Sequence, residues 1–209
     1  MVVAIDGRSG SGKTTLAEEL AGYLPGSVIL HTDDISWYES FFGWDHLMAA
    51  RVLLPLRRGS AVHFRPPAWD RRGREGAITV PAGVPFVIVE GVGSSRRSLG
   101  TLLDISIWVQ ADHEEAWRRG VARDGGSDEA AAFWEEWGRA EDRFLAEDRP
   151  WERASLTVCG TPDLVPPDDI DPGPQAALTA LLGADAAPSP AEVLTAVAGR
   201  SAGELACRC

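Results

Sequence analysis

Residues 7–14, Gly-Arg-Ser-Gly-Ser-Gly-Lys-Thr, constrain this chain more than any other part of its sequence. They match the spacing G-x-x-x-x-G-K-[ST], which is the signature of a phosphate-binding loop, or P-loop. The loop follows an apolar run, Val2–Ile5, and precedes a segment in which Leu16, Leu20 and Leu24 repeat at helical spacing. A strand, a glycine-rich turn and a helix in this order predict an α/β fold that binds a nucleotide.

Each residue type in the loop has a physical task in holding phosphate. Glycines let the backbone wrap closely around an anion and direct successive N–H groups toward it, and the following helix presents its positive N-terminus. Lys13 would neutralise charge on the β- and γ-phosphates, and the Thr14 hydroxyl would bind Mg²⁺. ATP and Mg²⁺ are therefore the predicted cofactors. The predicted nucleotide-binding residues are Gly7, Arg8, Ser9, Gly10, Ser11, Gly12, Lys13, Thr14 and Thr15.

The rest of the chain alternates apolar runs with helical patterns. Further core strands are predicted at 27–30, 85–89, 105–109 and 156–159, and helices at 13–24, 45–58, 112–123 and 127–147, the last with a break. Residues 60–83 are rich in Arg, Pro and Gly and are predicted to be mostly irregular. Alternating strands and helices imply a parallel sheet covered on both faces. The predicted fold is a P-loop NTPase three-layer α/β/α sandwich with a five-stranded parallel sheet.

Length and composition predict one domain and limit its partners. The 209 residues suffice for one α/β domain, which we place at 1–160, with a peripheral, partly flexible tail at 161–209. Cys207 and Cys209 in that tail lack the further ligands of a zinc site. The formal net charge of −11 gives no general attraction to nucleic acid or anionic membranes. No apolar stretch approaches a membrane span of about 20 residues, and the N-terminus lacks a signal-peptide pattern. We expect a cytoplasmic protein with no nucleic-acid or membrane partner, and homo-oligomerisation stays open.

Carboxylates follow three of the predicted strands. Asp6, Asp33 and Glu90 come at strand ends, and ligands of parallel sheets bind beyond the carboxyl ends of the strands. Asp33 could accept or orient the proton of an acceptor hydroxyl; the alternatives are a solvated side chain, a helix N-cap, or Asp34 in its place. Glu90 could organise Mg²⁺ together with Thr14, and the alternative is a salt bridge to an arginine.

Six ordered segments carry a resemblance to a known family. They are Ile5–Ala17, Asp33–Ile35, Phe41–His46, Pro67–Asp70, Val87–Gly91 and Arg118–Asp124. In this order they resemble the uridine kinase family of nucleoside kinases, whose relatives include phosphoribulokinase and bacterial pantothenate kinase. Trp69 stands where that family has Tyr, and the arginine-rich segment contains one extra residue.

The resemblance implies roles for further residues. It makes Asp33 the catalytic carboxylate and places an arginine-bearing helical lid at about 112–147, with Lys13, Arg118, Arg119 and Arg123 as catalytic cations. For the acceptor it implies Asp33, Asp45, His46, Trp69, Asp70 and Arg74, with Asp45 on ribose hydroxyls and Trp69 against a base or sugar. The alternatives are an exposed charged face for the arginines, a surface loop for the acceptor residues, and a core position for Trp69.

Together these features predict an ATP-dependent kinase that phosphorylates a hydroxyl of a small molecule. A nucleoside such as uridine or cytidine is the leading acceptor. One alternative is a kinase of the same fold for pantothenate or a sugar. Another is an ATP-binding or sensing module without acceptor chemistry.

Overall fold

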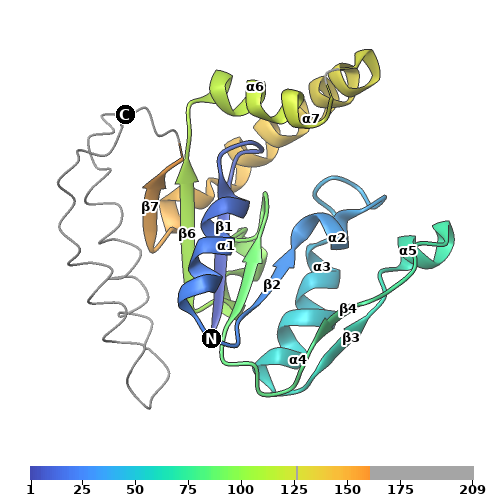
Figure 1. Cartoon of the computed structure of the whole chain (residues 1–209), viewed down its shortest axis with the longest axis vertical. Coiled ribbons are helices and arrows are strands. Elements are labelled where there is room, and N and C mark those ends of the chain that lie inside the picture. The colour runs from blue at the N-terminus through green and yellow to red at the C-terminus, as the bar shows by residue number, and fades with distance from the viewer. Residues whose placement is uncertain (126, 161–209) are drawn as a thin grey trace.

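The computed structural model describes residues 1–125 and 127–160 (Figure 1). Its centre is a five-stranded sheet in the order β2–β5–β1–β6–β7, and every pairing in it is parallel. The strands are β1 (Val2–Gly7), β2 (Val28–His31), β5 (Val87–Glu90), β6 (Ile105–Gln110) and β7 (Leu156–Cys159). The predicted parallel sheet of five strands, with helices flanking it, is confirmed.

The two faces of the sheet are covered by different helices. On one face, α1 (Lys13–Tyr23) packs through Ala17 and Leu20 against apolar side chains of the strands. On the other, a continuous helical stretch buries Met48 and Val52. This stretch consists of α3 (Asp45–Leu47), the π-helical turn η1 (Met48–Leu53) and α4 (Leu54–Arg57). Since both faces are covered, β1 is buried along its whole length, which explains its unbroken apolar run.

Residues 60–83 are more ordered than the sequence analysis predicts. They form an antiparallel hairpin of β3 (Val62–Phe64) and β4 (Ile78–Val80), with α5 (Pro67–Arg72) between its strands. In each strand two apolar residues are buried on either side of an exposed one. This period of two indicates a strand, but it is short and lies among Arg, Pro and Gly. The prediction of a mostly irregular region is therefore wrong.

A short helix and a helix pair lie near the carboxyl ends of the strands (Figure 1). The short helix is α2 (Thr32–Ser36), and the pair is α6 (His113–Arg123) and α7 (Asp128–Asp148). The predicted break inside 127–147 is wrong because α7 is continuous, with Ser127 as its N-cap. The chain turns before that cap, after Arg123. Short 3-10 helices, η2 (Arg97–Leu102) and η3 (Pro150–Arg153), complete the described elements.

The two helices of the pair fit each other closely through glycines. A Cβ atom placed on Gly120 would lie 2.0 Å from the ring of Trp134, and one on Gly138 would lie 2.7 Å from the ring of Trp117. The Trp134 indole also donates to Asp124 at 2.9 Å. Contacts this close leave no room for a side chain at either glycine, so α6 and α7 form one packed unit.

The predicted tail at 161–209, including Cys207 and Cys209, lies outside the described residues. Among the residues that are described, no helix combines the length and apolar character needed to cross a membrane.

Candidate active site

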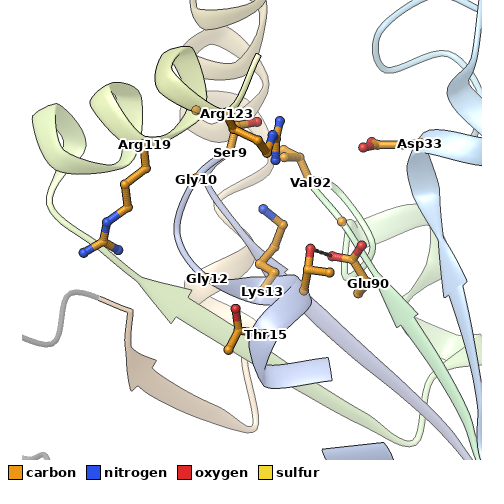
Figure 2. Close-up of a pocket in the computed structure, with 13 residues that line it drawn as sticks. Ser9, Gly10, Gly12, Lys13, Thr15, Asp33, Glu90, Val92, Arg119 and Arg123 are labelled. Atoms are coloured by element: carbon orange, nitrogen blue, oxygen red, sulfur yellow. Dashed lines mark hydrogen bonds between the residues drawn. The ribbon is translucent and has the colours of Figure 1, made fainter. Parts of the chain in front are cut away.

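The phosphate-binding loop joins the end of β1 to the start of α1. It turns through Gly10 and Gly12, which have φ values of 77° and 96° that favour glycine. A Cβ atom on Gly10 would lie 2.0 Å from the carbonyl oxygen of Ala116, so α6 rests directly on the loop. The strand–loop–helix arrangement predicted from the sequence is thus present, with the α1 N-terminus facing the hollow of the loop (Figure 2).

A cavity of about 440 Å³ opens beside this loop (Figure 2). Three segments at the ends of different strands supply its walls. They are the loop after β1, the start of α2 after β2, and the end of β5. The helix α6 adds a fourth wall. Among the predicted site residues, the lining includes Ser9, Gly10, Gly12, Lys13, Thr14, Thr15, Asp33, Glu90, Arg119 and Arg123. The predicted convergence of the loop, Asp33 and Glu90 therefore occurs.

The Lys13 side chain reaches into the hollow of the loop. It is 7% exposed, and its Nζ donates to the carbonyl oxygen of Arg8 at 2.8 Å. Burial lowers the pKa of the Lys13 ammonium, and nearby carboxylates, led by Glu90 and Glu141, oppose that shift. An ammonium carries three donors, so Lys13 retains donors for phosphate oxygens.

Glu90 lies opposite Thr14, at the end of β5. The Thr14 hydroxyl donates to Oε2 of Glu90 at 3.4 Å, and Nδ1 of His31 lies 2.5 Å from Oε1 of the same carboxylate. This hydrogen bond with Glu90 raises the pKa of His31. The alternative partner for Glu90 was an arginine, whereas the structure gives it a histidine.

The Thr14 and Glu90 oxygens fit Mg²⁺ as a donor set. Both are hard oxygen ligands, and their separation allows one ion to be held between them directly or through water. No group of three or more His, Cys, Asp or Glu suited to a metal occurs in the described part of the chain. A magnesium ion here would therefore take most of its ligands from phosphates and water, as this ion usually does.

Asp33 faces the loop from the first turn of α2 (Figure 2). His31 holds the N-cap position of that helix, so the N-cap alternative for Asp33 does not apply. The carboxylate is open to solvent on the cavity side, yet the surrounding walls desolvate it and raise its pKa. The charges of Lys13 and Arg123 oppose this shift. Asp34, the alternative to Asp33, is instead paired with Arg74 at 2.5 Å.

The three predicted lid arginines have different surroundings. Arg123 and Arg119 line the cavity, but the Arg119 guanidinium is turned away from Lys13 (Figure 2). It donates instead to the carbonyl oxygen of Gly160 at 2.8 Å. Arg118 does not line the cavity; it is largely exposed and pairs with Glu115 at 2.7 Å, as the charged-face alternative predicts.

The remaining residues predicted for the acceptor do not reach the cavity. None of Asp45, His46, Trp69, Asp70 and Arg74 lines the cavity. Trp69 is 4% exposed in the core, and its indole donates to the carbonyl oxygen of Asp34 at 2.8 Å. The Arg74 guanidinium lies over the Trp69 ring, 3.7 Å from its centre. Asp45 accepts from Ser98 at 2.6 Å, Asp70 pairs with Arg65, and His46 is exposed.

Two buried carboxylates support the loop and were not predicted to have this role. Asp6 is 0% exposed and accepts the backbone N–H groups of Gly7, Gly93 and Ser95 at 2.8–2.9 Å. Burial raises the pKa of Asp6, and these hydrogen bonds oppose the shift. Glu141 of α7 accepts the backbone N–H of Ser9 at 2.8 Å. In the sequence, Asp6 directly ends an apolar run and Glu141 interrupts an apolar helical face, which marks both positions as unusual without indicating their partners.

Known proteins that resemble this chain include uridine kinases and solved structures of kinases. No family model matches the sequence. A uridine kinase of Staphylococcus haemolyticus (strain JCSC1435) is 30% identical over 144 residues, which are 59% of this chain and 68% of that protein. A structure described as a possible uridine kinase from Bacillus stearothermophilus superposes with a TM-score of 0.52 at 20% identity, covering 75% of this chain and 87% of that one. A candidate fructose transport system kinase from Silicibacter sp. TM1040 has a TM-score of 0.50 at 25% identity, with coverages of 75% and 88%.

Proposed function

Because this chain belongs to the uridine kinase family, we propose that it transfers the γ-phosphoryl group of ATP to a hydroxyl of a nucleoside such as uridine or cytidine. The family makes the chain a P-loop kinase, and the acceptor is the new element of the proposal. The observation that supports it best is the meeting of Lys13, Glu90 and Asp33 at one cavity, from three separate segments. Phosphoryl transfer needs a phosphate cradle, a metal site and an oriented acceptor, and these residues match those needs.

The loop and Lys13 would bind and neutralise the phosphates. Backbone N–H groups around Gly10 and Gly12 form an anion nest, and Lys13 adds a buried positive charge. When bound, Mg²⁺·ATP would supply the phosphoryl group and further positive charge. Thr14 and Glu90 would hold the metal, with His31 fixing the orientation of the Glu90 carboxylate.

Asp33 and Arg123 would act on the acceptor side of the cavity. Asp33 is placed to orient the attacking hydroxyl and to accept its proton, because it faces the loop across the cavity. Its raised pKa brings the carboxyl closer to the pKa range of an effective base. Arg123 would place positive charge near the transferring group, while Arg119 braces α6 against Gly160.

The acceptor residues implied by the resemblance would act through α2. Arg74 pairs with Asp34 and Trp69 donates to the carbonyl oxygen of Asp34, next to Asp33 in the chain. These contacts would fix the direction of the Asp33 carboxylate. Asp45, His46 and Asp70 would contribute only through the shape of the neighbouring segments.

We further propose that residues 1–160 form the kinase unit and that it works in the cytoplasm, where ATP is available. Among the residues that the structure describes, those lining the cavity run from Ser9 to Arg123, inside this unit. The helix pair α6 and α7 would serve as the lid.

A substrate panel with ADP formation as the readout tests the acceptor. Uridine and cytidine should stimulate ADP release, and pantothenate and fructose should not. Fructose belongs in the panel because of the likeness to a candidate fructose transport system kinase. Turnover of fructose or pantothenate with both nucleosides inactive would refute the nucleoside assignment. ATP binding without stimulation by any acceptor, and without an effect of Asp33→Ala, would favour a binding or sensing module.

A further inference from the structure

Glu141 is a buried carboxylate that contacts the phosphate-binding loop from α7. It is 5% exposed, and its Oε1 accepts the backbone N–H of Ser9 at 2.8 Å. Its Oε2 lies 3.4 Å from Nη1 of Arg8. One carboxylate of the lid region therefore holds two consecutive residues at the start of the loop.

Two further side chains of α7 reach the same loop residues. Trp137, about one turn before Glu141, donates its indole N–H to Oγ of Ser9 at 2.8 Å. Asp142 accepts from Nη1 of Arg8 at 2.6 Å. Residues four apart lie on one side of a helix, so Trp137 and Glu141 present a polar edge of α7 to the loop.

Core packing does not explain a carboxylate at this position. The neighbouring buried positions of α7 hold Trp134, Phe144 and Leu145. An apolar residue at position 141 would continue that stripe without the cost of desolvating a charge. The charge is tolerated because Ser9 and Arg8 satisfy it, so its partner is the loop rather than the core.

Ser9 is well placed to transmit this constraint. It directly precedes Gly10, where the chain enters its left-handed turn and the phosphate-facing amides begin. On the other side of Gly10 lies the backbone of Ala116 in α6. Because α6 and α7 pack as one unit, the same helix pair contacts the loop at both Ser9 and Gly10 and carries Arg123.

We propose that Glu141 is a positioning residue that preorganises the loop for the phosphates of the nucleotide, which rests on the proposed function. An anion nest that is already shaped binds its ligand without first losing conformational freedom. Loss of the carboxylate should therefore weaken nucleotide binding and leave the KM for the acceptor unchanged. A residue that only stabilised the fold would not produce this split.

Calorimetric titration with a Mg²⁺-bound, non-hydrolysable ATP analogue tests the proposal. Glu141→Leu keeps the side-chain bulk and removes the acceptor of the Ser9 N–H, so Kd should rise about tenfold. Glu141→Gln keeps an oxygen that can accept this N–H, so Kd should stay within about threefold of wild type. Glu147→Leu, at an exposed position of the same helix, is the matched control and should not change Kd. Thermal unfolding of each variant reports whether the fold is intact.

A second variant keeps the test decisive if Glu141→Leu does not fold. Trp137→Phe keeps an aromatic ring beside Phe41 and Phe42 but removes the indole donor to Ser9, so Kd should rise about threefold. The smaller ring packs less well, so Tm should fall by a few degrees while the variant stays folded. An unchanged Kd in folded Glu141→Leu or Trp137→Phe protein, or equal weakening by Gln and Leu at position 141, would overturn the proposal. If wild-type protein binds the analogue but phosphorylates no acceptor, the proposed function fails, and the binding series still decides the role of Glu141.

Discussion

The phosphate-binding loop and the segment from Asp33 to Val80 are built in different ways. In the loop the proposed binding groups are backbone amides, and two buried carboxylates, Asp6 and Glu141, accept the N–H groups of Gly7 and Ser9 beside them. In the second segment the polar groups are side chains that mostly pair with one another, as Arg74 does with Asp34. A site made of backbone amides depends on the path of the main chain and on the few glycines that allow that path. A site made of paired side chains can be altered by single substitutions, so we expect the acceptor to vary more readily than the nucleotide.

Of the substitutions considered, Lys13→Met should have the largest effect, because it acts on the phosphate-binding loop. Lys13→Met removes the buried positive charge of the loop, so turnover should fall about a thousandfold or more. Calorimetry should also show much weaker uptake of Mg²⁺·ATP. Burial disfavours the charged ammonium and lowers its pKa, so an uncharged methionine side chain costs less free energy to bury at this position. Thermal unfolding should therefore show that the variant is still folded. Wild-type nucleotide affinity in this variant would refute the role of the loop.

Asp33→Asn tests the carboxylate that begins the segment from Asp33 to Val80 and faces the phosphate-binding loop. The amide cannot accept a proton, so kcat should fall about a hundredfold to a thousandfold while the nucleotide Kd stays near wild type. The folded-state pKa of Asp33 is raised, which means that its charged form costs folding free energy at neutral pH. The asparagine variant should therefore melt no lower than the wild type, and solvent at this exposed side chain keeps any gain small.

The same shift predicts the pH dependence of the wild-type enzyme. A base must be unprotonated, so kcat/KM should fall as the pH drops through the pKa of Asp33. That acid limb should lie above the ordinary value of 3.8. A protonated Asp33 carries no charge to desolvate. By linkage, its contribution to the free energy of unfolding should therefore become more favourable as the pH falls through its pKa. Full activity in Asp33→Asn would remove Asp33 from the chemistry.

The sequence predicts these two regions unequally well, and the reason is physical. The loop motif and the apolar strand runs are local patterns, so the parallel sheet and the meeting of Lys13, Asp33 and Glu90 could be predicted. The carboxylate of Glu141 reaches Ser9 across 132 positions of sequence, and no local pattern encodes such a contact. Trp69 illustrates the same limit, because a core tryptophan and a stacking tryptophan look identical in sequence.

Arg123→Ala, compared with Arg118→Ala, sharpens the assignment of the lid. Arg123 lines the cavity, so its loss should lower kcat about tenfold to a hundredfold. Arg118 is exposed on the same helix and paired with Glu115, so its loss should change kcat less than about twofold. Acceptor-dependent ADP formation at saturating ATP measures both. Equal losses would mean that the helix acts through its general charge and that lining the cavity does not matter.

Arg74→Ala is the mildest test, and it asks whether the acceptor side depends on paired side chains. The variant leaves Asp34 unpaired and uncovers the ring of Trp69, and both contacts adjoin Asp33. Since the pair is partly exposed, the KM for the acceptor should rise about threefold to tenfold, with an unchanged Kd for the nucleotide. Arg74→Lys can still neutralise Asp34 but stacks less well on Trp69, so it should recover only part of the loss. A change in nucleotide affinity instead would show that this segment and the phosphate-binding loop are coupled, through Asp33 and α2.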